Sequence, residues 1–388
     1  MYNILTLNSI SEVGLNKLEP EKFAVSGEMA NPDGIILRSF NMHETELGDN
    51  LKAIARAGAG TNNIPIDKCT EKGIVVFNTP GANANAVKEL VLAGLFLSSR
   101  KIAQSMEWAK TLKGEGDNVG KLVEKGKSNF VGPEIEGKKL GIIGLGAIGV
   151  MVANAAYHLG MDVIGYDPYI SVDAAWGLSR HVKKADNVKD LVAECDYITL
   201  HVPLNDSTKN MIGKELFSVM KKGARILNFA RGGLVDEAAL KEAISDGTVA
   251  SYVTDFPNDN ILGLENVVCI PHLGASTPES EDNCAKMASV EIQDYLCEGN
   301  IVNSVNFPNC ALAREGKTRI TIAHKNVPNC VSNFTNLCAK EGFNIANMIN
   351  KSRKDLAYTI IDLDNDVDAS IAKDFEALEN VMKVRVIK

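Results

Sequence analysis

Apolar and polar positions alternate along residues 1–98 in a way that predicts a parallel sheet. Short apolar runs, each stopped by Gly, Asn or Pro, alternate with helical segments, and this pattern is typical of strands joined by crossover helices. A helix over residues 84–100 is apolar on nearly every face, so we expect it to be buried. The strands predicted in this first domain are Tyr2–Leu7, Gly34–Ser39, Leu51–Ala57 and Gly73–Asn78.

The same alternation continues over residues 99–271 and predicts a second α/β domain with a doubly wound sheet. Polar residues cluster just after the carboxyl ends of its strands, at residues 201–208, 231–233, 255–260 and 272–277. In a doubly wound sheet this edge is where ligands bind. A long amphipathic helix over residues 278–298 then returns to the first domain, which we expect residues 272–300 to complete.

The pattern changes after a linker that contains Pro and Asn. Residues 317–388 read as strand, helix, strand, strand, helix, strand. This βαββαβ order is typical of a ferredoxin-like α+β unit. The sequence therefore predicts three domains, two of them α/β and the last α+β.

A glycine turn in the second domain indicates a dinucleotide site. The strand Leu140–Ile143 leads into Gly144, Gly146 and Gly149 at the start of a helix, and a second strand ends at Asp167, 18 residues past the last glycine. Such glycines allow a tight turn, close approach of a pyrophosphate and close packing of helix on strand. The free N–H groups of the helix then bind the phosphates. A carboxylate at Asp167 suits the ribose hydroxyls of NAD and repels the 2′-phosphate of NADP.

Composition narrows the class of protein further. At 388 residues with 45% apolar and 23% charged residues, the chain reads as a soluble globular protein of two or three domains. A net charge of −8 argues against nucleic acid or a membrane surface as partner. We find no secretory signal, and the eight cysteines, none in a C-x-x-C pair, indicate reduced thiols in a cytoplasmic protein without a metal site.

Hydride transfer between NAD and an alcohol needs a base for the hydroxyl proton and a cation for an anionic substrate. His272, after Pro271 at a strand end, suits the base, and Arg231, after an apolar strand, suits a carboxylate clamp. Either residue could instead be structural, His272 by bonding a loop carbonyl and Arg231 by pairing with an acid. Asp255 and Asp259 both lie on the same edge and either could orient His272, and a turn or capping role is open for both.

Six stretches of the chain resemble the D-2-hydroxyacid dehydrogenase family. They are IILRS (35–39), ARAGAGTNNI (55–64), NTPGANANAVKEL (78–90), LGIIGLGAIG (140–149), NFARGGLVDEAAL (228–240) and PHLGASTPESEDNCA (271–285). The resemblance implies a Rossmann-type NAD domain and a flavodoxin-like substrate-binding domain that closes on it, in a homo-oligomer. The closest likeness is to members that oxidise 3-phosphoglycerate to 3-phosphohydroxypyruvate in the first step of L-serine biosynthesis.

The resemblance also implies roles for individual residues. Catalysis would fall to His272 and Arg231, with Asp259 in the place of a glutamate because the stretch DFPND is one residue shorter than in the family. Ala147 stands where the family often has a basic residue, so the backbone must bind more of the pyrophosphate. The implied NAD contacts are Gly144, Gly146, Ala147, Ile148, Gly149, Asp167, His201, Val202, Pro203, Ala230, Arg231, Asp255, His272 and Gly274. The implied substrate contacts are Arg38, Ser39, Gly58, Ala59, Gly60, Arg231 and His272.

The third domain resembles an ACT domain, the serine-sensing module of many of these dehydrogenases. By that resemblance His324, Asn326 and Asn344 would receive L-serine, although Asn329 stands where a glycine is common, and a purely assembling tail is the alternative. Two other functions stay open at this point. One is a reductase for glyoxylate, hydroxypyruvate or another 2-oxo acid, and the other is a non-catalytic NADH-sensing interaction protein.

Overall fold

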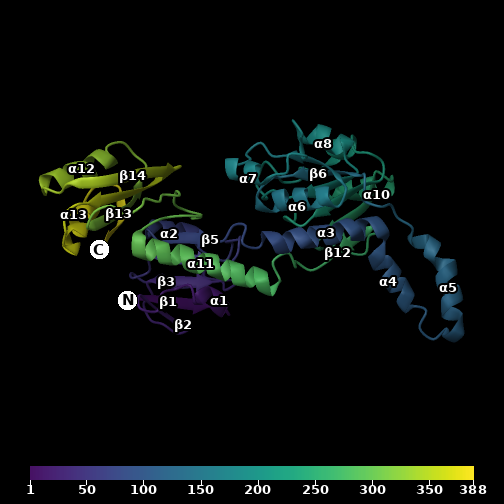
Figure 1. The fold of residues 1–388 in the computed structure, drawn as a ribbon, viewed down its shortest axis with the longest axis horizontal. Helices are drawn as coiled ribbons and strands as arrows, with labels where there is room; N and C mark the ends of the chain where they lie inside the picture. The colour runs from purple at the N-terminus through teal and green to yellow at the C-terminus, as the bar shows by residue number, and fades with distance from the viewer. The chain divides into compact units, whose positions relative to one another are not determined.

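The computed structural model describes all 388 residues and divides the chain into two compact units. Unit 1 combines residues 1–83 with residues 278–388, and unit 2 consists of residues 84–277. The chain passes between the units twice, after Asn83 and after Thr277. Figure 1 shows the strands of the first segment in purple to blue, unit 2 largely in teal and the carboxyl-terminal sheet in yellow-green.

The first sheet of unit 1 is parallel and has the strand order β2-β1-β3-β4-β5. This is the flavodoxin-like order, which confirms the predicted architecture. The four predicted strands are present, whereas β2 was not predicted, because its four residues are only partly apolar. The elements are β1 (Tyr2–Leu7), α1 (Glu12–Leu15), β2 (Phe23–Ser26), β3 (Gly34–Leu37), β4 (Ala53–Arg56), α2 (Ile66–Glu71) and β5 (Val75–Asn78).

The helix α11 (Pro278–Glu298) completes this domain, as the sequence predicts. It runs beside the first sheet in Figure 1 and contacts α1, β3, β4 and β5. The approach to α1 is close, since a Cβ on Gly14 would stand 2.3 Å from the side chain of Ala285. Buried residues of α11, among them Ile292 and Leu296, share one hydrophobic core with Ile4 and Phe77 of the sheet.

Unit 2 contains a seven-stranded parallel sheet with the order β12-β11-β10-β9-β6-β7-β8. Counted from β6, this is the Rossmann order 3-2-1-4-5-6 with one strand added, so the doubly wound prediction is confirmed. Its strands are β6 (Lys139–Ile143), β7 (Asp162–Tyr166), β8 (Lys183–Lys184), β9 (Tyr197–Leu200), β10 (Ala224–Asn228), β11 (Val249–Thr254) and β12 (Val267–Cys269). Its helices are α3 (Ala84–Arg100), α4 (Ile102–Lys110), α5 (Val119–Gly126), α6 (Ala147–His158), α7 (Val172–Gly177), α8 (Val188–Glu194), α9 (Lys214–Phe217) and α10 (Glu237–Ser245).

The border between the units differs from the predicted one at residue 98. Helix α3 belongs to unit 2, because it packs on α6, β10 and β11. Its Gly94 lies so close to this sheet that an added Cβ would stand 2.7 Å from the ring of Phe229. Val91 and Leu95 are buried in the same core. A helix that is apolar on nearly every face can pack on either neighbour, so its sequence did not determine the border.

The carboxyl-terminal sheet has the order β14-β15-β13-β16 with antiparallel pairs throughout. This is the ferredoxin-like arrangement predicted from the βαββαβ pattern. Its elements are β13 (Thr318–Lys325), α12 (Cys330–Lys340), β14 (Ile345–Arg353), β15 (Leu356–Leu363), α13 (Ala372–Glu376) and β16 (Val381–Ile387). Ala323, Tyr358 and Ile360 of this sheet belong to the same buried core as the first sheet and α11.

Two buried arginines join the carboxyl-terminal sheet to the end of α11. Arg385 donates to the carbonyls of Tyr295 and Leu296 at 2.8 and 2.6 Å. Arg319 donates to the Glu298 carbonyl at 2.9 Å and pairs with the fully buried Asp362. The last carbonyls of a helix lack partners within it and carry partial negative charge, so guanidinium groups stabilise this end.

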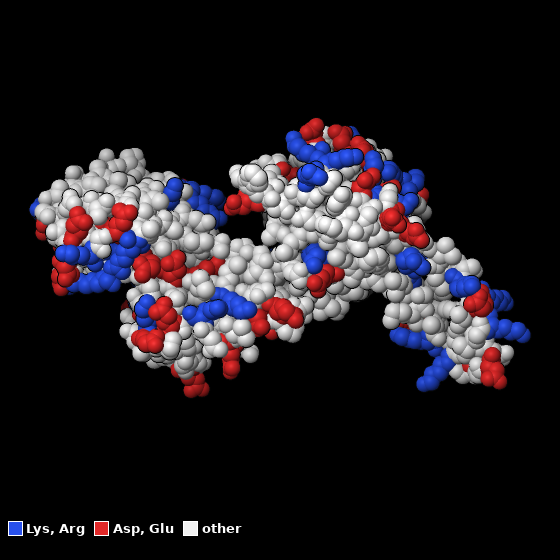
Figure 2. Space-filling view, viewed as in Figure 1, with Lys and Arg blue, Asp and Glu red and all other residues white.

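Surface chemistry adds two observations. No helix is long and apolar enough to cross a membrane. On the face drawn in Figure 2, basic and acidic side chains are interspersed over α8 and the surface around it.

Candidate functional site

The glycine turn between β6 and α6 has the geometry that a pyrophosphate requires. Gly144 has a φ of 96°, and a Cβ there would stand 2.5 Å from the His201 carbonyl oxygen. A Cβ on Gly149 would stand 2.0 Å from the Gly144 oxygen, so only glycine permits this packing. Gly146 immediately precedes α6, and a Cβ there would meet no protein atom within 4 Å. The first N–H groups of α6, from Ala147 and Ile148 onward, are therefore open to an anion.

Asp167 stands at the end of β7, where the ribose of a dinucleotide is expected. Its Oδ2 accepts a hydrogen bond from the Leu145 N–H at 2.8 Å, and its Oδ1 accepts one from the Tyr169 N–H at 2.8 Å. Each carboxylate oxygen can accept a further bond. The side chain is thus fixed in place by the glycine turn itself and keeps acceptor capacity for hydroxyl groups.

His201 follows β9 directly and is held inside unit 2. Its Nε2 lies 3.0 Å from the Thr199 hydroxyl, and burial lowers the pKa of the imidazole to about 4. The ring is therefore neutral at physiological pH. The next residue, Val202, packs against Gly144 and so contributes to the same turn region, and Pro203 follows it.

Arg231, Asp255 and His272 follow β10, β11 and β12, which are adjacent strands of the sheet. Burial raises the pKa of the Asp255 carboxyl, while the positive charges of His272 and Arg231 both oppose that rise. These three side chains therefore interact electrostatically, as expected for residues gathered at one ligand edge. Gly274 is part of the same group, since a Cβ on it would stand 3.6 Å from the Asp255 Oδ2.

The turn that carries Arg231 is organised by a residue that sequence reasoning did not single out. Asn228, fully buried at the end of β10, donates to the Arg231 carbonyl at 2.8 Å and accepts from the Ala230 N–H at 3.2 Å. The exposed Arg231 guanidinium donates to the Ala230 carbonyl at 2.7 Å. A polar residue that interrupts an apolar strand just before the arginine was the available signal.

His272 is exposed, and its ring lies 4.7 Å from the ring of Phe256. Phe256, next to Asp255, is a second residue that the sequence did not indicate. Asp259 lies in an exposed turn beyond Pro257. Asp255, the other acid that the sequence left open, is buried, and the charge of His272 lowers the pKa of its carboxyl against the rise caused by burial.

The substrate residues expected in unit 1 lie at the ends of β3 and β4. Arg38 pairs with Glu281 of α11 at 2.5 Å, and the Ser39 N–H donates to Asn8 at 3.0 Å. The loop of Gly58, Ala59 and Gly60 folds over Arg56, whose guanidinium would stand 2.4 Å from a Cβ on Gly58. Arg56 is a cation that our residue assignments omitted, although it stands inside one of the matched motifs.

The three residues expected to bind an effector have different surroundings. His324 is buried, and its ring nitrogens contact the Lys325 carbonyl at 2.9 Å and the Thr359 hydroxyl at 2.9 Å. Its ring is thus part of the core of the carboxyl-terminal sheet in this structure. Asn326 and Asn344 are more accessible and donate to the Lys354 carbonyl and to Asp364.

Fold and ligand edge together define a dinucleotide-binding α/β protein. Residues 92–274 match the family model described as the D-isomer specific 2-hydroxyacid dehydrogenase, NAD binding domain. Residues 92–274 are therefore similar to the NAD-binding domains of this family. The glycine turn and Asp167 fit the NAD that the family binds, and the cofactor supplies the hydride acceptor when bound.

Several named proteins are similar to this chain. D-3-phosphoglycerate dehydrogenase of Methanocaldococcus jannaschii is 40% identical over 280 residues, which are 71% of this chain and 51% of that protein. The Bacillus subtilis enzyme of the same name is 31% identical over 365 residues, 88% of this chain and 65% of that protein. The NAD+-bound 3-phosphoglycerate dehydrogenase of Entamoeba histolytica superposes with a TM-score of 0.59 at 28% identity, covering 79% of this chain and 98% of that one. The chain spans about half the length of the first curated relatives it matches.

Proposed function

We propose that this protein oxidises 3-phosphoglycerate to 3-phosphohydroxypyruvate with NAD, the first step of L-serine biosynthesis. The observation that carries the proposal is the group formed by Arg231, Asp255 and His272 beside the dinucleotide turn. This group offers the carboxylate clamp and the base that oxidation of a 2-hydroxy acid requires. The names of the relatives support the choice of substrate.

Each residue has a defined part in this proposal. His272 takes the proton of the substrate hydroxyl as the hydride leaves the adjacent carbon. Arg231 holds the substrate carboxylate with two parallel hydrogen bonds, for which its guanidinium has further N–H donors besides the one bonded to the Ala230 carbonyl. The Asp255 carboxylate stabilises His272 once it is protonated. In unit 1, Arg38 and the loop over Arg56 are the candidate groups for the substrate phosphate.

The test is a comparison of substrates in NAD-linked steady-state assays. We expect NADH formation with 3-phosphoglycerate to exceed that with D-glycerate and D-lactate, because neither analogue carries the phosphate. A preference for glyoxylate or hydroxypyruvate in the reducing direction would instead assign the protein to the 2-oxo acid reductases. Absence of turnover with all of these compounds, together with NADH binding, would favour an NADH-sensing protein.

The carboxyl-terminal sheet is proposed as an ACT-like regulatory unit that responds to L-serine. The zwitterion needs amide donors and acceptors, which Asn326 and Asn344 can supply near the surface. L-serine at millimolar concentration should inhibit the phosphoglycerate assay, and Asn344→Ala should remove the inhibition without changing uninhibited activity. No effect on rate and no binding by calorimetry would leave an assembling role for this unit.

A homo-oligomer is the third part of the proposal. Helices α4 and α5 carry apolar side chains at their surface, including Met106 at 59% exposed, and exposed apolar groups of this kind mark protein contacts. Light scattering of the purified chain should give a dimer or tetramer. A monomer at all concentrations would contradict this assignment.

A further inference from the structure

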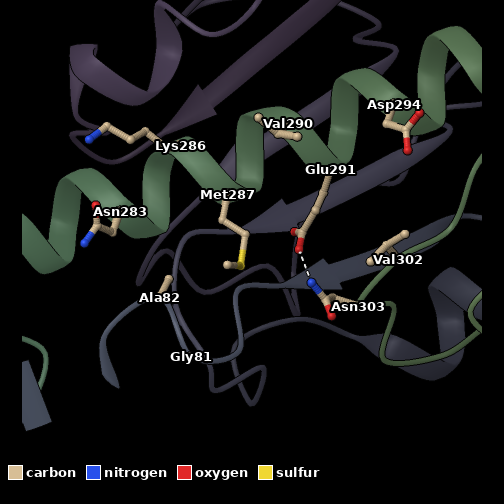
Figure 3. Close-up of a pocket in the computed structure, with 10 residues that line it drawn as sticks. All are labelled: Gly81, Ala82, Asn283, Lys286, Met287, Val290, Glu291, Asp294, Val302 and Asn303. Atoms are coloured by element: carbon tan, nitrogen blue, oxygen red, sulfur yellow. Dashed lines mark hydrogen bonds between the residues drawn. The ribbon is translucent and has the colours of Figure 1, made fainter. Parts of the chain in front are cut away.

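A cavity of about 640 Å³ lies beside α11 in unit 1, apart from the residues assigned to catalysis and cofactor binding. One wall is the helix face that carries Met287, Val290 and Glu291, and the opposite wall is made by Gly81–Ala82 and by Val302–Asn303 (Figure 3). This volume is typical of small-molecule sites and far exceeds that of a single water, which takes about 30 Å³.

The chemical centre of the cavity is Glu291, which is 93% buried because its exposed fraction is 7%. Its Oε1 accepts a hydrogen bond from Asn303 Nδ2 at 2.7 Å, whereas no protein group hydrogen-bonds its Oε2. Figure 3 shows the side chain leaving the helix toward Asn303, alongside Met287. The carboxyl is thus oriented by one oxygen, while the other is buried and has no protein partner.

The wall opposite Glu291 is itself fixed. Asn303 has a φ of 61°, a left-handed conformation that asparagine tolerates. Its N–H donates to the Asn309 side chain at 3.0 Å, and its carbonyl accepts from the Asn78 N–H at 3.4 Å. Two backbone hydrogen bonds therefore hold Asn303 in place, and its side chain in turn fixes the position of the Glu291 carboxyl.

Charge decides what this carboxyl can bind. No Lys or Arg forms an ion pair with Glu291, and Lys286, on the same helix, points away from it in Figure 3. Two other charged groups line the cavity, the cation Lys286 and the anion Asp294, which accepts from Asn300 at 3.1 Å. Burial raises the pKa of Glu291 to about 8, so below that pH the carboxyl is protonated. A carboxyl in an ion pair with a cation would stay ionised. A bound cation would replace that proton.

The rest of the cavity is suited to hydrocarbon. Val290 and Val302 are 53% and 42% exposed at its mouth, and Met287 and Ala82 line it further. No cluster of acids, histidines or cysteines is placed to hold a metal ion. We propose that this cavity binds a small primary alkylammonium ion, with its nitrogen on Glu291 and its hydrocarbon part on Met287, Val290 and Val302.

Calorimetric titration of n-butylammonium chloride into the full-length protein tests the proposal, with butyramide as the uncharged probe of similar shape. Butylammonium should bind and release a proton, which is measured as a dependence of the heat on the buffer. The affinity for butylammonium should increase as the pH increases toward 8, by up to about tenfold per pH unit, because the cation competes with the proton on Glu291. Primary amines stay charged over this range, as lysine does.

Three variants sharpen the experiment. Glu291→Gln keeps an acceptor for Asn303 and should weaken butylammonium binding by at least tenfold, whereas Glu298→Gln, the same change on the same helix outside the cavity, should leave it unchanged. Val290→Trp, at an exposed position, should block the mouth and abolish binding. Equal binding by Glu291→Gln, or no binding of butylammonium by wild-type protein, would overturn the proposal. Preferential binding of butyramide that weakens as pH rises would also overturn it, because the carboxyl would then act as a neutral donor.

Discussion

In unit 2 the chemically active side chains stand after the carboxyl ends of parallel strands, whereas in unit 1 the most strongly perturbed carboxyl, Glu291, lies in the middle of a helix. His201, which is half-buried, and Glu291, which is buried, show the contrast, since desolvation displaces the pKa of the first to about 4 and of the second to about 8. Burial disfavours the charged form of both groups. The fold of unit 2 places several ionisable side chains at one edge of its sheet, whereas Glu291 in unit 1 lines a separate cavity.

The two units therefore differ in the kind of site that their folds can form. At a strand edge, neighbouring strands bring several groups together, so Arg231, Asp255 and His272 form the candidate reaction site. On a helix, one face offers a single carboxyl whose only protein partner is Asn303. The first arrangement suits catalysis, and the second suits binding of one complementary group.

The largest expected effect is on catalysis by unit 2. His272→Ala should lower kcat by roughly 10²–10⁴, as expected for loss of a general base, while NADH binding is nearly retained. The matched control is His158→Ala, which removes an exposed histidine at the end of α6. Steady-state kinetics and cofactor fluorescence measure both quantities. A His272→Ala variant with near-normal kcat would remove this residue from the role of base.

Arg231→Ala should chiefly lower kcat/KM for the 2-hydroxy acid, because the carboxylate clamp is lost. Arg231→Lys should recover only part of it, since an ammonium cannot form the two parallel bonds of a guanidinium. The control is Arg180→Ala at an exposed position. If full activity persisted in Arg231→Ala, the clamp would have to lie elsewhere.

The second effect concerns the cofactor. Two like charges about 4 Å apart repel by roughly 1 kcal/mol in water and about 4 kcal/mol near a protein surface. The Asp167 carboxylate should therefore make kcat/KM for NAD exceed that for NADP by roughly fivefold to a thousandfold. Asp167→Asn should reduce the ratio of kcat/KM for NAD to kcat/KM for NADP. Equal values for the two cofactors in the wild-type protein would contradict the role of Asp167.

The third effect is on stability, where the two units should respond to pH with opposite sign. The folded pKa of Glu291 is raised, so the folded state holds a proton that the unfolded state releases, and stability falls as pH rises from about 4.5 to 8. The folded pKa of His201 is lowered, so stability falls as pH drops from about 6.5 to 4.

Glu291→Gln isolates one side of this comparison. The free energy of unfolding of wild-type protein should fall between pH 5 and pH 8.5, and that of Glu291→Gln should not show this fall. The difference between the two proteins should therefore change by on the order of 3–5 kcal/mol in favour of the variant, because the variant lacks the carboxyl with the raised pKa. Urea unfolding followed by circular dichroism at the two pH values measures the change. An identical pH dependence in both proteins would show that Glu291 is not the responsible group.

The smallest effect separates the two candidate acids. Asp255→Asn should reduce kcat by less than the loss of His272 and move the acid limb of the pH profile to lower pH, because a protonated His272 loses the attraction of that carboxylate. Asp259→Asn, in an exposed turn, should leave the profile unchanged. The reverse result would restore Asp259 as the orienting acid.

The sequence revealed what local spacing determines. Gly144 and Asp167 were found because a strand, a turn and a helix follow one another within one unit, and Arg231 and His272 because polar residues directly follow apolar strands. The choice between Asp255 and Asp259 does not follow from local spacing, since it depends on which residue still lies inside the sheet edge. The pairing of Glu291 with Asn303 joins a helix to a linker that only the fold brings together. His324 likewise became a core residue through contacts with a strand far along the chain.

The central claim is hydride transfer from a 2-hydroxy acid to NAD at the edge of unit 2, and isotope transfer tests it most directly. 3-Phosphoglycerate carrying deuterium at C2 would be incubated with the protein and NAD, and the reduced cofactor would be analysed by mass spectrometry. The account predicts one deuterium in the reduced nicotinamide and none when His272→Ala replaces the wild-type protein over the same time. Reduced cofactor without deuterium, or no reduction by the wild-type protein, would contradict it.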